Sequence, residues 1–189
     1  MSPALLVRKR DSSATRAALL KAATAHFARE AYDSVSLRSI ASAAKVDVSL
    51  VSRYFGSKEE LFAAVLAGCP GPDEMFVGEL KDFGERVARM VVDDFIHEEK
   101  PDLFRIMLHS ADHPIAAEAV RKSGEERFFG PFERYLGGRN APERVRLAAS
   151  IIKGVVMDRL ISDDLGLTPA QRERFRARLA KMLQAAIEE

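Results

Sequence analysis

A short segment near the N-terminus carries side chains that could contact nucleic acid. Val48, Ser49, Leu50, Ser52 and Arg53 lie within six positions, and helical periodicity leaves them outside the apolar stripe. A helix of this length fits the major groove of B-DNA, which is about 12 Å wide, and offers its first side chains to base edges. The segment is therefore a candidate for reading a DNA sequence.

Two short helices, 37–43 and 48–54, must position these side chains. Helices of about seven residues are too short to be stable alone, so we expect them to pack as one unit. Asp47 is a natural N-cap for the second helix, because its carboxylate can accept hydrogen bonds from first-turn amides. The pattern is that of a helix-turn-helix. Its expected apolar contacts are Ile40, Ala41, Ala44, Val46, Val51 and Tyr54.

Charge separates along the 189-residue chain although the net charge is only +1. The first 60 residues hold ten basic and six acidic groups, a net of +4, and the remainder has a net of −3. An excess of basic residues around a predicted helix-turn-helix is the charge distribution expected for a protein that binds DNA phosphates. Arg8, Lys9 and Arg10 predict a flexible arm over residues 1–10, which either follows the DNA or is a solubilising tail.

The whole chain is predicted to be all-α. Apolar residues recur at helical spacing throughout, and no segment alternates with the period of a strand. Ser57 to Glu60 and Thr168 to Gln171 have the pattern of capping boxes, which mark helix starts. The expected helices are about 13–30, 37–43, 48–54, 58–68, 74–97, 102–110, 115–136, 142–161 and 169–187.

Several other classes of protein and site are disfavoured. One cysteine, Cys69, excludes an intramolecular disulfide or a multi-thiolate zinc site. His109 and His113 are four apart, but a helix break is expected between them, so no metal or other cofactor is predicted. The sequence contains no phosphate-binding loop and no nucleophile elbow, so an enzyme is disfavoured. The excess of basic residues in 1–60 argues against an adaptor that binds only protein. No apolar run is long enough to span a membrane, so we expect a soluble, cytoplasmic protein.

A longer pattern resembles a known family. Over residues 11–69, the order and spacing of the residues named at the end of this paragraph resemble the DNA-binding domain of TetR/AcrR-type transcriptional regulators. The helix-turn-helix motif lies at about 36–55. The resemblance implies an all-helical homodimer with an N-terminal three-helix DNA-binding domain and a C-terminal domain, here 70–189, for dimerisation and effector binding. It also implies a repressor that a small molecule releases from a palindromic operator. The matching residues are Thr15-Arg16, Leu19 to Ala23, Phe27, Tyr32, Ser36 to Ala41, Val46, Tyr54-Phe55 and Ser57 to Leu61.

Two departures from the family pattern affect the proposed interface. Lys45 stands where the turn usually has Gly, at a cost of about 1 kcal/mol if its φ is positive, and the ammonium group could compensate by reaching a phosphate. Ser52 replaces a common Tyr, which leaves the bases that are read open. Tyr54 and Lys58 match phosphate-contacting positions, although the Tyr54 ring could equally pack in the core. The candidate DNA-binding residues are Arg38, Lys45, Val48, Ser49, Leu50, Ser52, Arg53, Tyr54 and Lys58.

The C-terminal helices are expected to form a dimer and to enclose an effector. Helix 142–161 is hydrophobic nearly all round and must be buried on two sides, so it can pair with helix 169–187 across a two-fold axis. A ligand-independent or activating regulator is the alternative to a ligand-released repressor. The candidate lining of an apolar effector cavity, as opposed to a filled core, is Phe104, Met107, Phe128, Phe132 and Met157.

Overall fold

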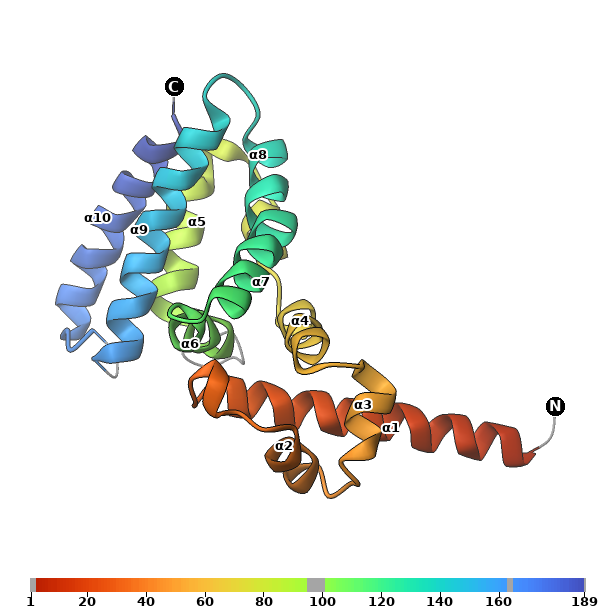
Figure 1. Ribbon diagram of the computed structural model, residues 1–189. Coiled ribbons are helices and arrows are strands. Elements are labelled where there is room, and N and C mark those ends of the chain that lie inside the picture. The colour runs from red at the N-terminus through yellow and green to blue at the C-terminus, as the bar shows by residue number, and fades with distance from the viewer. Residues whose placement is uncertain (1–2, 95–100, 163–164, 189) are drawn as a thin grey trace. The chain divides into compact units, whose positions relative to one another are not determined.

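The described chain is helical. The computed structural model describes residues 3–94, 101–162 and 165–188, and no strand occurs among them, which confirms the all-α prediction. Figure 1 follows the helices from α1 near the N-terminus to α10 near the C-terminus. The α-helices are α1 (Pro3–Phe27), α2 (Leu37–Ala43), α3 (Ser49–Phe55), α4 (Lys58–Gly68), α5 (Phe83–Arg89), α6 (Pro101–Ser110), α7 (Pro114–Gly124), α8 (Gly130–Leu136), α9 (Ala141–Ile161) and α10 (Pro169–Ile187).

The helices form two compact units. Unit 1 combines the chain up to Cys69 with Arg105–Ser123, and unit 2 combines Pro70–Phe104 with the chain from Gly124 onward. Unit 1 therefore contains α1 to α4, most of α6 and nearly all of α7. Among the described residues no helix is both long and apolar enough to cross a lipid bilayer.

Aromatic side chains form the centre of unit 1. Phe27 from α1 and Phe62 from α4 meet edge to face, with their ring centroids 4.9 Å apart. Tyr32, in the short 3-10 turn η1 (Tyr32–Ser34), contacts both rings. Offset and edge-to-face pairs of this kind add to the stabilisation from burial. They hold the long helix α1 against α4. Helix α2 packs on α1, and α3 packs on α4.

Two of the predicted helix starts are confirmed by their caps. Ser57 accepts a hydrogen bond from the Glu60 N–H, and the Glu60 carboxylate accepts one from the Ser57 N–H, so α4 begins with a complete capping box. Thr168 and Gln171 make the same reciprocal pair at the start of α10. Helix α1 differs from the prediction, because it begins at Pro3 and so includes most of the predicted arm; its side chains before residue 12 lie outside the described residues.

The predicted single helix over 74–97 is wrong. Residues 73–82 form two 3-10 turns, η2 (Asp73–Phe76) and η3 (Leu80–Asp82), and α5 starts only at Phe83. Gly78 between the turns has a φ of +109°, which a helix does not allow. The Arg86 guanidinium donates to the Met75 and Glu79 carbonyls and so holds the turns in place.

Wider π turns end α5 and interrupt the predicted helix 115–136. The first, η4 (Met90–Asp94), follows α5, and its Val91 and Val92 carbonyls accept hydrogen bonds from Arg159 and Arg172. The second, η6 (Glu125–Phe129), separates α7 from α8. Pro131 lies two residues after it and has no N–H to donate to a carbonyl four residues earlier, which favours the wider spacing.

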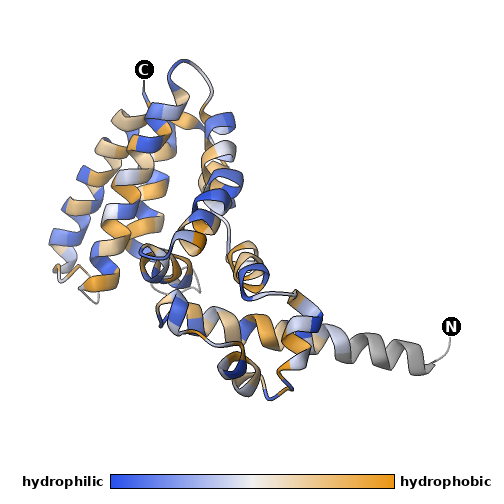
Figure 2. Ribbon diagram, in the orientation of Figure 1, coloured by the Kyte–Doolittle hydropathy of each residue, from blue (hydrophilic) through white to orange (hydrophobic). Residues whose placement is uncertain are grey.

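The core of unit 2 lies between α5, α8, α9 and α10. Its buried side chains include Phe83, Val87, Phe132, Val145 and Leu183. Helices α5 and α10 approach closely at Gly84, where an added Cβ would lie 2.2 Å from the Ala180 carbonyl oxygen. Figure 2 shows hydrophobic residues running along α9 and α10.

Candidate nucleic-acid interface

Helices α2 and α3 form the predicted helix-turn-helix around a small apolar core. Ile40 and Ala41 from α2 and Val51 and Phe55 from α3 are buried. Ser36 caps α2 by accepting a hydrogen bond from the Ser39 N–H at 3.0 Å. The prediction placed Tyr54 among the apolar contacts, whereas Phe55 fills the core and Tyr54 is half-buried beside it. The packed face of α3 is thereby fixed, and the opposite face remains accessible.

The turn between the two helices contains a strained lysine. Lys45 has a φ of +57°, in the left-handed region that glycine adopts without cost. Its side chain is exposed. The turn is closed by a hydrogen bond from the Val46 N–H to the Ala41 carbonyl at 3.0 Å. The family resemblance suggested this conformation, and the structure has it.

Asp47 holds the first residue of α3 through one carboxylate oxygen that accepts two hydrogen bonds. Its Oδ1 accepts a hydrogen bond from the Ser49 N–H at 2.8 Å and another from the Ser49 hydroxyl at 2.5 Å. These two bonds lower the pKa of the Asp47 carboxyl below its usual value. Asp47 was predicted to be the N-cap of α3. In the structure Val48 occupies the N-cap position, and Asp47 binds the N–H of Ser49, the first residue of the helix.

The outer face of α3 and the adjoining turn present most of the predicted residues. Val48, Ser49, Ser52 and Arg53 are exposed, and Leu50 is half-buried. Val48 is 40% exposed and adds an apolar side chain to this surface. The surface therefore combines apolar, hydroxyl and cationic groups on one short helix.

Three cations of the helix-turn-helix have no partner within the described chain. Arg38, Lys45 and Arg53 are exposed and form no ion pair or side-chain hydrogen bond with any residue that the structure describes. By contrast, Lys81 and Arg176 elsewhere in the chain are each bound to carboxylates. The positive charge of the helix-turn-helix is therefore uncompensated locally.

Lys58 does not lie with the other predicted contacts. Its Nζ donates to the Tyr32 carbonyl oxygen at 2.6 Å and lies 4.4 Å from the centre of the Tyr32 ring. Partial burial lowers the pKa of this ammonium group below its usual value. Tyr54 stays half-buried next to the exposed face. The structure thus brings together the predicted residues from Arg38 to Arg53 and turns Lys58 towards η1.

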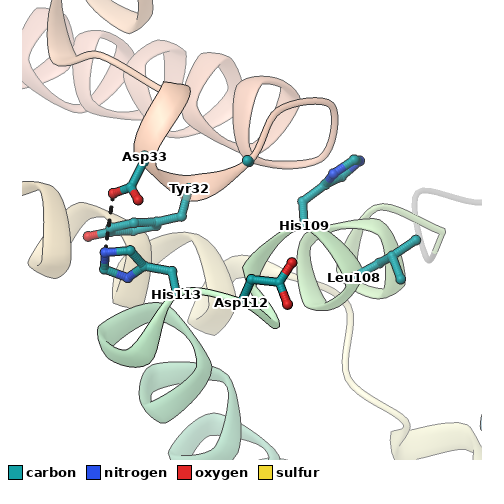
Figure 3. Close-up of a pocket in the computed structure, with 7 residues that line it drawn as sticks. Tyr32, Asp33, Leu108, His109, Asp112 and His113 are labelled. Carbon is teal, nitrogen blue, oxygen red and sulfur yellow. Dashed lines mark ion pairs between the residues drawn. The ribbon is translucent and has the colours of Figure 1, made fainter.

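A small polar hollow lies in unit 1 beside η1 (Figure 3). His113, at the corner between α6 and α7, packs on Tyr32 with ring centroids 4.5 Å apart, and its Nε2 lies 3.2 Å from Asp33 Oδ1. The hollow has a volume of about 190 Å³, below the roughly 300–1,000 Å³ of pockets for drug-sized ligands. Its lining is Ala31, Tyr32, Asp33, Leu108, His109, Asp112 and His113.

The histidine pair does not form a metal site. His109 lies in α6, which ends at Ser110, whereas His113 lies in the connection before α7, which begins at Pro114, and the two side chains point in different directions (Figure 3). Over residues 3–94, 101–162 and 165–188, no group of three or more His, Cys, Asp or Glu side chains is arranged to hold a metal ion.

The predicted effector residues are divided between the units. Met107 belongs to unit 1, whereas Phe104, Phe128, Phe132 and Met157 belong to unit 2. Phe132 is fully buried. It forms an aromatic cluster with Phe128 and with Phe76, whose ring centroid lies 5.3 Å from that of Phe132. Phe76 was not among the residues predicted to line an effector cavity.

One further residue beside the helix-turn-helix was absent from the predicted set. Arg16, an exposed residue of α1, holds its guanidinium 4.8 Å from the centre of the Phe55 ring. Cation–π contact of this kind links α1 to α3 and keeps a cation next to the recognition helix. The sequence contained no local signal for this contact, because 39 positions separate the two residues.

Known families match both parts of the chain. The family described as "Bacterial regulatory proteins, tetR family" matches residues 19–65, and "Tetracyclin repressor-like, C-terminal domain" matches residues 81–187. A curated relative, the HTH-type transcriptional repressor SCO4008 of Streptomyces coelicolor, is 42% identical over 57 residues. That match spans 30% of this chain and 30% of the relative's length.

Solved structures share the fold over nearly the whole chain. NalD of Pseudomonas aeruginosa, described as the secondary repressor of the MexAB-OprM multidrug efflux pump, has a TM-score of 0.68 at 21% identity. The alignment covers 93% of this chain and 97% of NalD. The multidrug binding protein EbrR complexed with proflavin has a TM-score of 0.59 at 18% identity, with 89% and 99% of the two chains covered.

Proposed function

This chain belongs to the TetR family of bacterial regulatory proteins, and from that premise we propose that it is a repressor that binds a palindromic DNA operator as a homodimer and is released by a small molecule. The family consists of transcriptional regulators, so the chain is not an enzyme. We assign residues 11–69 to DNA binding and 70–189 to dimerisation and effector binding, with residues 1–10 as a basic arm. We place the protein in the cytoplasm, where its DNA would be.

The uncompensated cations of the helix-turn-helix carry the proposal of DNA binding. Arg38, Lys45 and Arg53 are exposed around α3 and have no carboxylate partner among the described residues. Polyanion binding gains free energy when such cations displace condensed counterions from phosphates. The exposed side chains Val48, Ser49 and Ser52 then lie where base edges would be reached.

Salt-dependent binding to duplex DNA tests this proposal. We expect the logarithm of the binding constant for random duplex to fall linearly with the logarithm of the salt concentration. The double variant Arg38→Ala with Arg53→Ala should show a shallower slope, whereas Lys81→Ala, which removes a cation already paired with Glu79, should not. Absence of binding by the unmodified protein at low salt would overturn the proposed function.

Lys58 and Tyr54 complete the proposed phosphate contacts. The Lys58 ammonium group has three N–H donors, of which one donates to the Tyr32 carbonyl, so donors are left for a phosphate oxygen. Lys58→Ala is therefore expected to weaken binding to all sequences alike and to reduce the salt slope by about one. An unchanged slope in a titration of this variant would remove Lys58 from the contact set.

Exposed apolar residues on the last two helices support a homodimer. Leu147 on α9 and Met182 on α10 are 55% and 57% exposed. Gly154, about two turns along the same face of α9 from Leu147, has nothing within 4 Å of an added Cβ, so a partner backbone can approach there. An isologous contact through helices α9 and α10, which correspond to the predicted 142–161 and 169–187, would cover these groups.

An apolar, aromatic effector is the ligand class that we propose. Phe104, Phe128, Phe132 and Met157 supply large or pliable side chains to unit 2. The similarly folded EbrR has been solved with proflavin, a planar aromatic compound. Titration of planar aromatic compounds into the protein–operator complex tests the proposal, and release of DNA is the expected result. A regulator that responds to none of them, or that activates a reporter gene, would support the alternative of a ligand-independent or activating function.

A further inference from the structure

We propose that Ser49 acts only as a hydrogen-bond acceptor towards DNA, and so selects a base with an exocyclic amino group, adenine or cytosine, at the operator position that it contacts. Asp47 is the positioning residue that imposes this polarity. The inference rests on the proposed DNA binding and specifies what the α3 surface would recognise.

The geometry at the start of α3 determines the direction of the hydrogen bond. The Ser49 hydroxyl oxygen lies 2.5 Å from Asp47 Oδ1, and the Ser49 N–H donates to the same oxygen at 2.8 Å. An ionised carboxylate has no hydrogen to give, so the serine must be the donor in both bonds. The same two bonds stabilise the charged form and keep the pKa of Asp47 below its usual value, so the carboxyl is ionised at neutral pH.

The hydrogen bond to Asp47 removes the donor capacity of the Ser49 hydroxyl towards DNA. A hydroxyl has one hydrogen and two acceptor lone pairs, and an unconstrained serine can therefore pair with either donors or acceptors on DNA. With its only hydrogen directed at Asp47, Ser49 retains only acceptor capacity. In the major groove the donors are adenine N6 and cytosine N4, whereas guanine N7 and O6 and thymine O4 are acceptors.

The neighbouring exposed residues do not restore a donor at this point. Val48 is apolar and 40% exposed, and Asp47 itself is exposed and can only accept. The next exposed donors, Ser52 and Arg53, lie one turn further along α3. Val48 also matches the thymine methyl group, so an A·T pair, with its amino group and methyl group in the same groove, satisfies both side chains.

Selection from random duplexes with the full-length protein provides the first test. The position that depends on Ser49 is identified as the one whose preference is lost in Ser49→Ala and kept in Ser49→Thr, which retains the hydroxyl. The unmodified protein should favour adenine or cytosine there by about 2-fold to 10-fold, the effect of a single hydrogen bond. In Asp47→Ala the acceptor of the Ser49 hydroxyl hydrogen is lost and that hydrogen becomes free, so this preference should broaden to include guanine or thymine.

A base analogue separates reading by Ser49 from a structural role of Asp47. Purine in place of adenine, or pyrimidin-2-one in place of cytosine, removes only the exocyclic amino group. We expect the unmodified protein to lose affinity for this duplex by the same factor as Ser49→Ala loses for the natural one, and Ser49→Ala to be insensitive to the analogue. Ser52→Ala is the matched control, because its hydroxyl has no carboxylate partner among the described residues, and it should remain sensitive.

Two outcomes would overturn the inference while the proposed function stands. One is recovery of guanine or thymine at the position that depends on Ser49, and the other is equal affinity of the unmodified protein for the natural and the analogue duplex. These tests do not need the Asp47 variant, so they hold even if that variant fails to fold. Failure of the proposed function is recognised separately, as absence of any salt-dependent binding to duplex DNA.

Discussion

At the level of single residues, Lys45 combines an unfavourable backbone conformation with an exposed positive charge. A non-glycine residue with a φ of +57° pays a steric cost of about 1 kcal/mol, because its Cβ lies close to the following carbonyl oxygen. The same residue is an exposed cation without a partner among the described residues. A lysine at this turn is understandable if its charge contributes to DNA binding.

Replacement of Lys45 by glycine should separate the two effects. Lys45→Gly is expected to raise the free energy of unfolding by about 1 kcal/mol and to weaken binding to duplex DNA. Lys45→Ala, which loses the charge but keeps the Cβ, should weaken binding without the gain in stability. Urea denaturation and salt titration measure the two effects. Equal stability of the glycine and alanine variants would show that the turn is not strained.

Tyr32 gives a pH-dependent prediction at the same scale. Burial, together with the nearby negative charges of Glu59 and Asp33, raises the pKa of the Tyr32 hydroxyl to about 12. In the unfolded chain a tyrosine titrates near pH 10. Between about pH 10 and pH 12 the unfolded state therefore loses this proton while the folded state keeps it, and the free energy of unfolding falls with rising pH, by up to about 1.4 kcal/mol per pH unit.

The variant Tyr32→Phe should lack this contribution. Its stability is expected to decline less steeply than that of the unmodified protein above pH 10, and to follow it in parallel below pH 10. Urea denaturation at pH 9 and pH 11.5 provides the comparison, with Tyr54→Phe as the matched control. Parallel profiles up to pH 12 would contradict the raised pKa.

At the level of elements, helix starts were easier to predict than helix continuity. The capping boxes at Ser57 and Thr168 are formed by residues three apart, so the sequence contains them completely. The π turns at Met90–Asp94 and Glu125–Phe129 occur inside the segments 74–97 and 115–136, which were each expected to be one continuous helix. The first is held by Arg159 and Arg172, about 70 to 80 residues away along the chain.

Removal of the Thr168 cap tests how much α10 depends on it. Thr168→Ala should lower the free energy of unfolding by about 1 kcal/mol, because the Gln171 N–H at the start of α10 loses the Thr168 hydroxyl as its acceptor. Thr168→Ser retains the hydroxyl and should remain close to the unmodified protein. The comparison requires equilibrium denaturation of all three proteins, and a serine variant as unstable as the alanine variant would assign the loss to the side-chain methyl group instead.

At the level of the whole molecule, the near-neutral net charge conceals two different parts. A net of +4 lies on the first 60 residues and −3 on the rest, and the cations of the helix-turn-helix are not neutralised by the described residues around them. An acidic remainder reduces non-specific adhesion to DNA while the basic part binds it. The acidic part also contains the exposed apolar residues of α9 and α10, which favour self-association.

Charged substitutions on α9 and α10 should separate dimerisation from DNA contact. Leu147→Glu combined with Met182→Glu is expected to produce monomers in sedimentation, because burial of two carboxylates in the proposed interface is unfavourable. Affinity for a duplex with two half-sites should fall towards that for a single half-site. The control Val77→Glu alters a side chain that is 67% exposed outside these helices, and it should leave the association state unchanged. A variant that still sediments as a dimer would place the interface elsewhere.

The sequence by itself determined the features that depend on local periodicity and capping. The helical period separates the buried Ile40 and Val51 from the exposed Ser49 and Arg53 on the same two short helices, so the candidate reading surface could be predicted without coordinates. The exchange of Tyr54 for Phe55 in the core was missed, because adjacent aromatic residues differ by only one step of that period.

Only the tertiary structure decided the contacts between distant parts of the chain. Lys58 lies 26 residues from the Tyr32 carbonyl that it binds, and His113 lies 80 residues from its partner Asp33. A lysine at the start of a helix is equally compatible with solvent, a phosphate or a buried carbonyl. The choice depends on which acceptor the packing brings within about 3 Å, and local sequence cannot encode that distance.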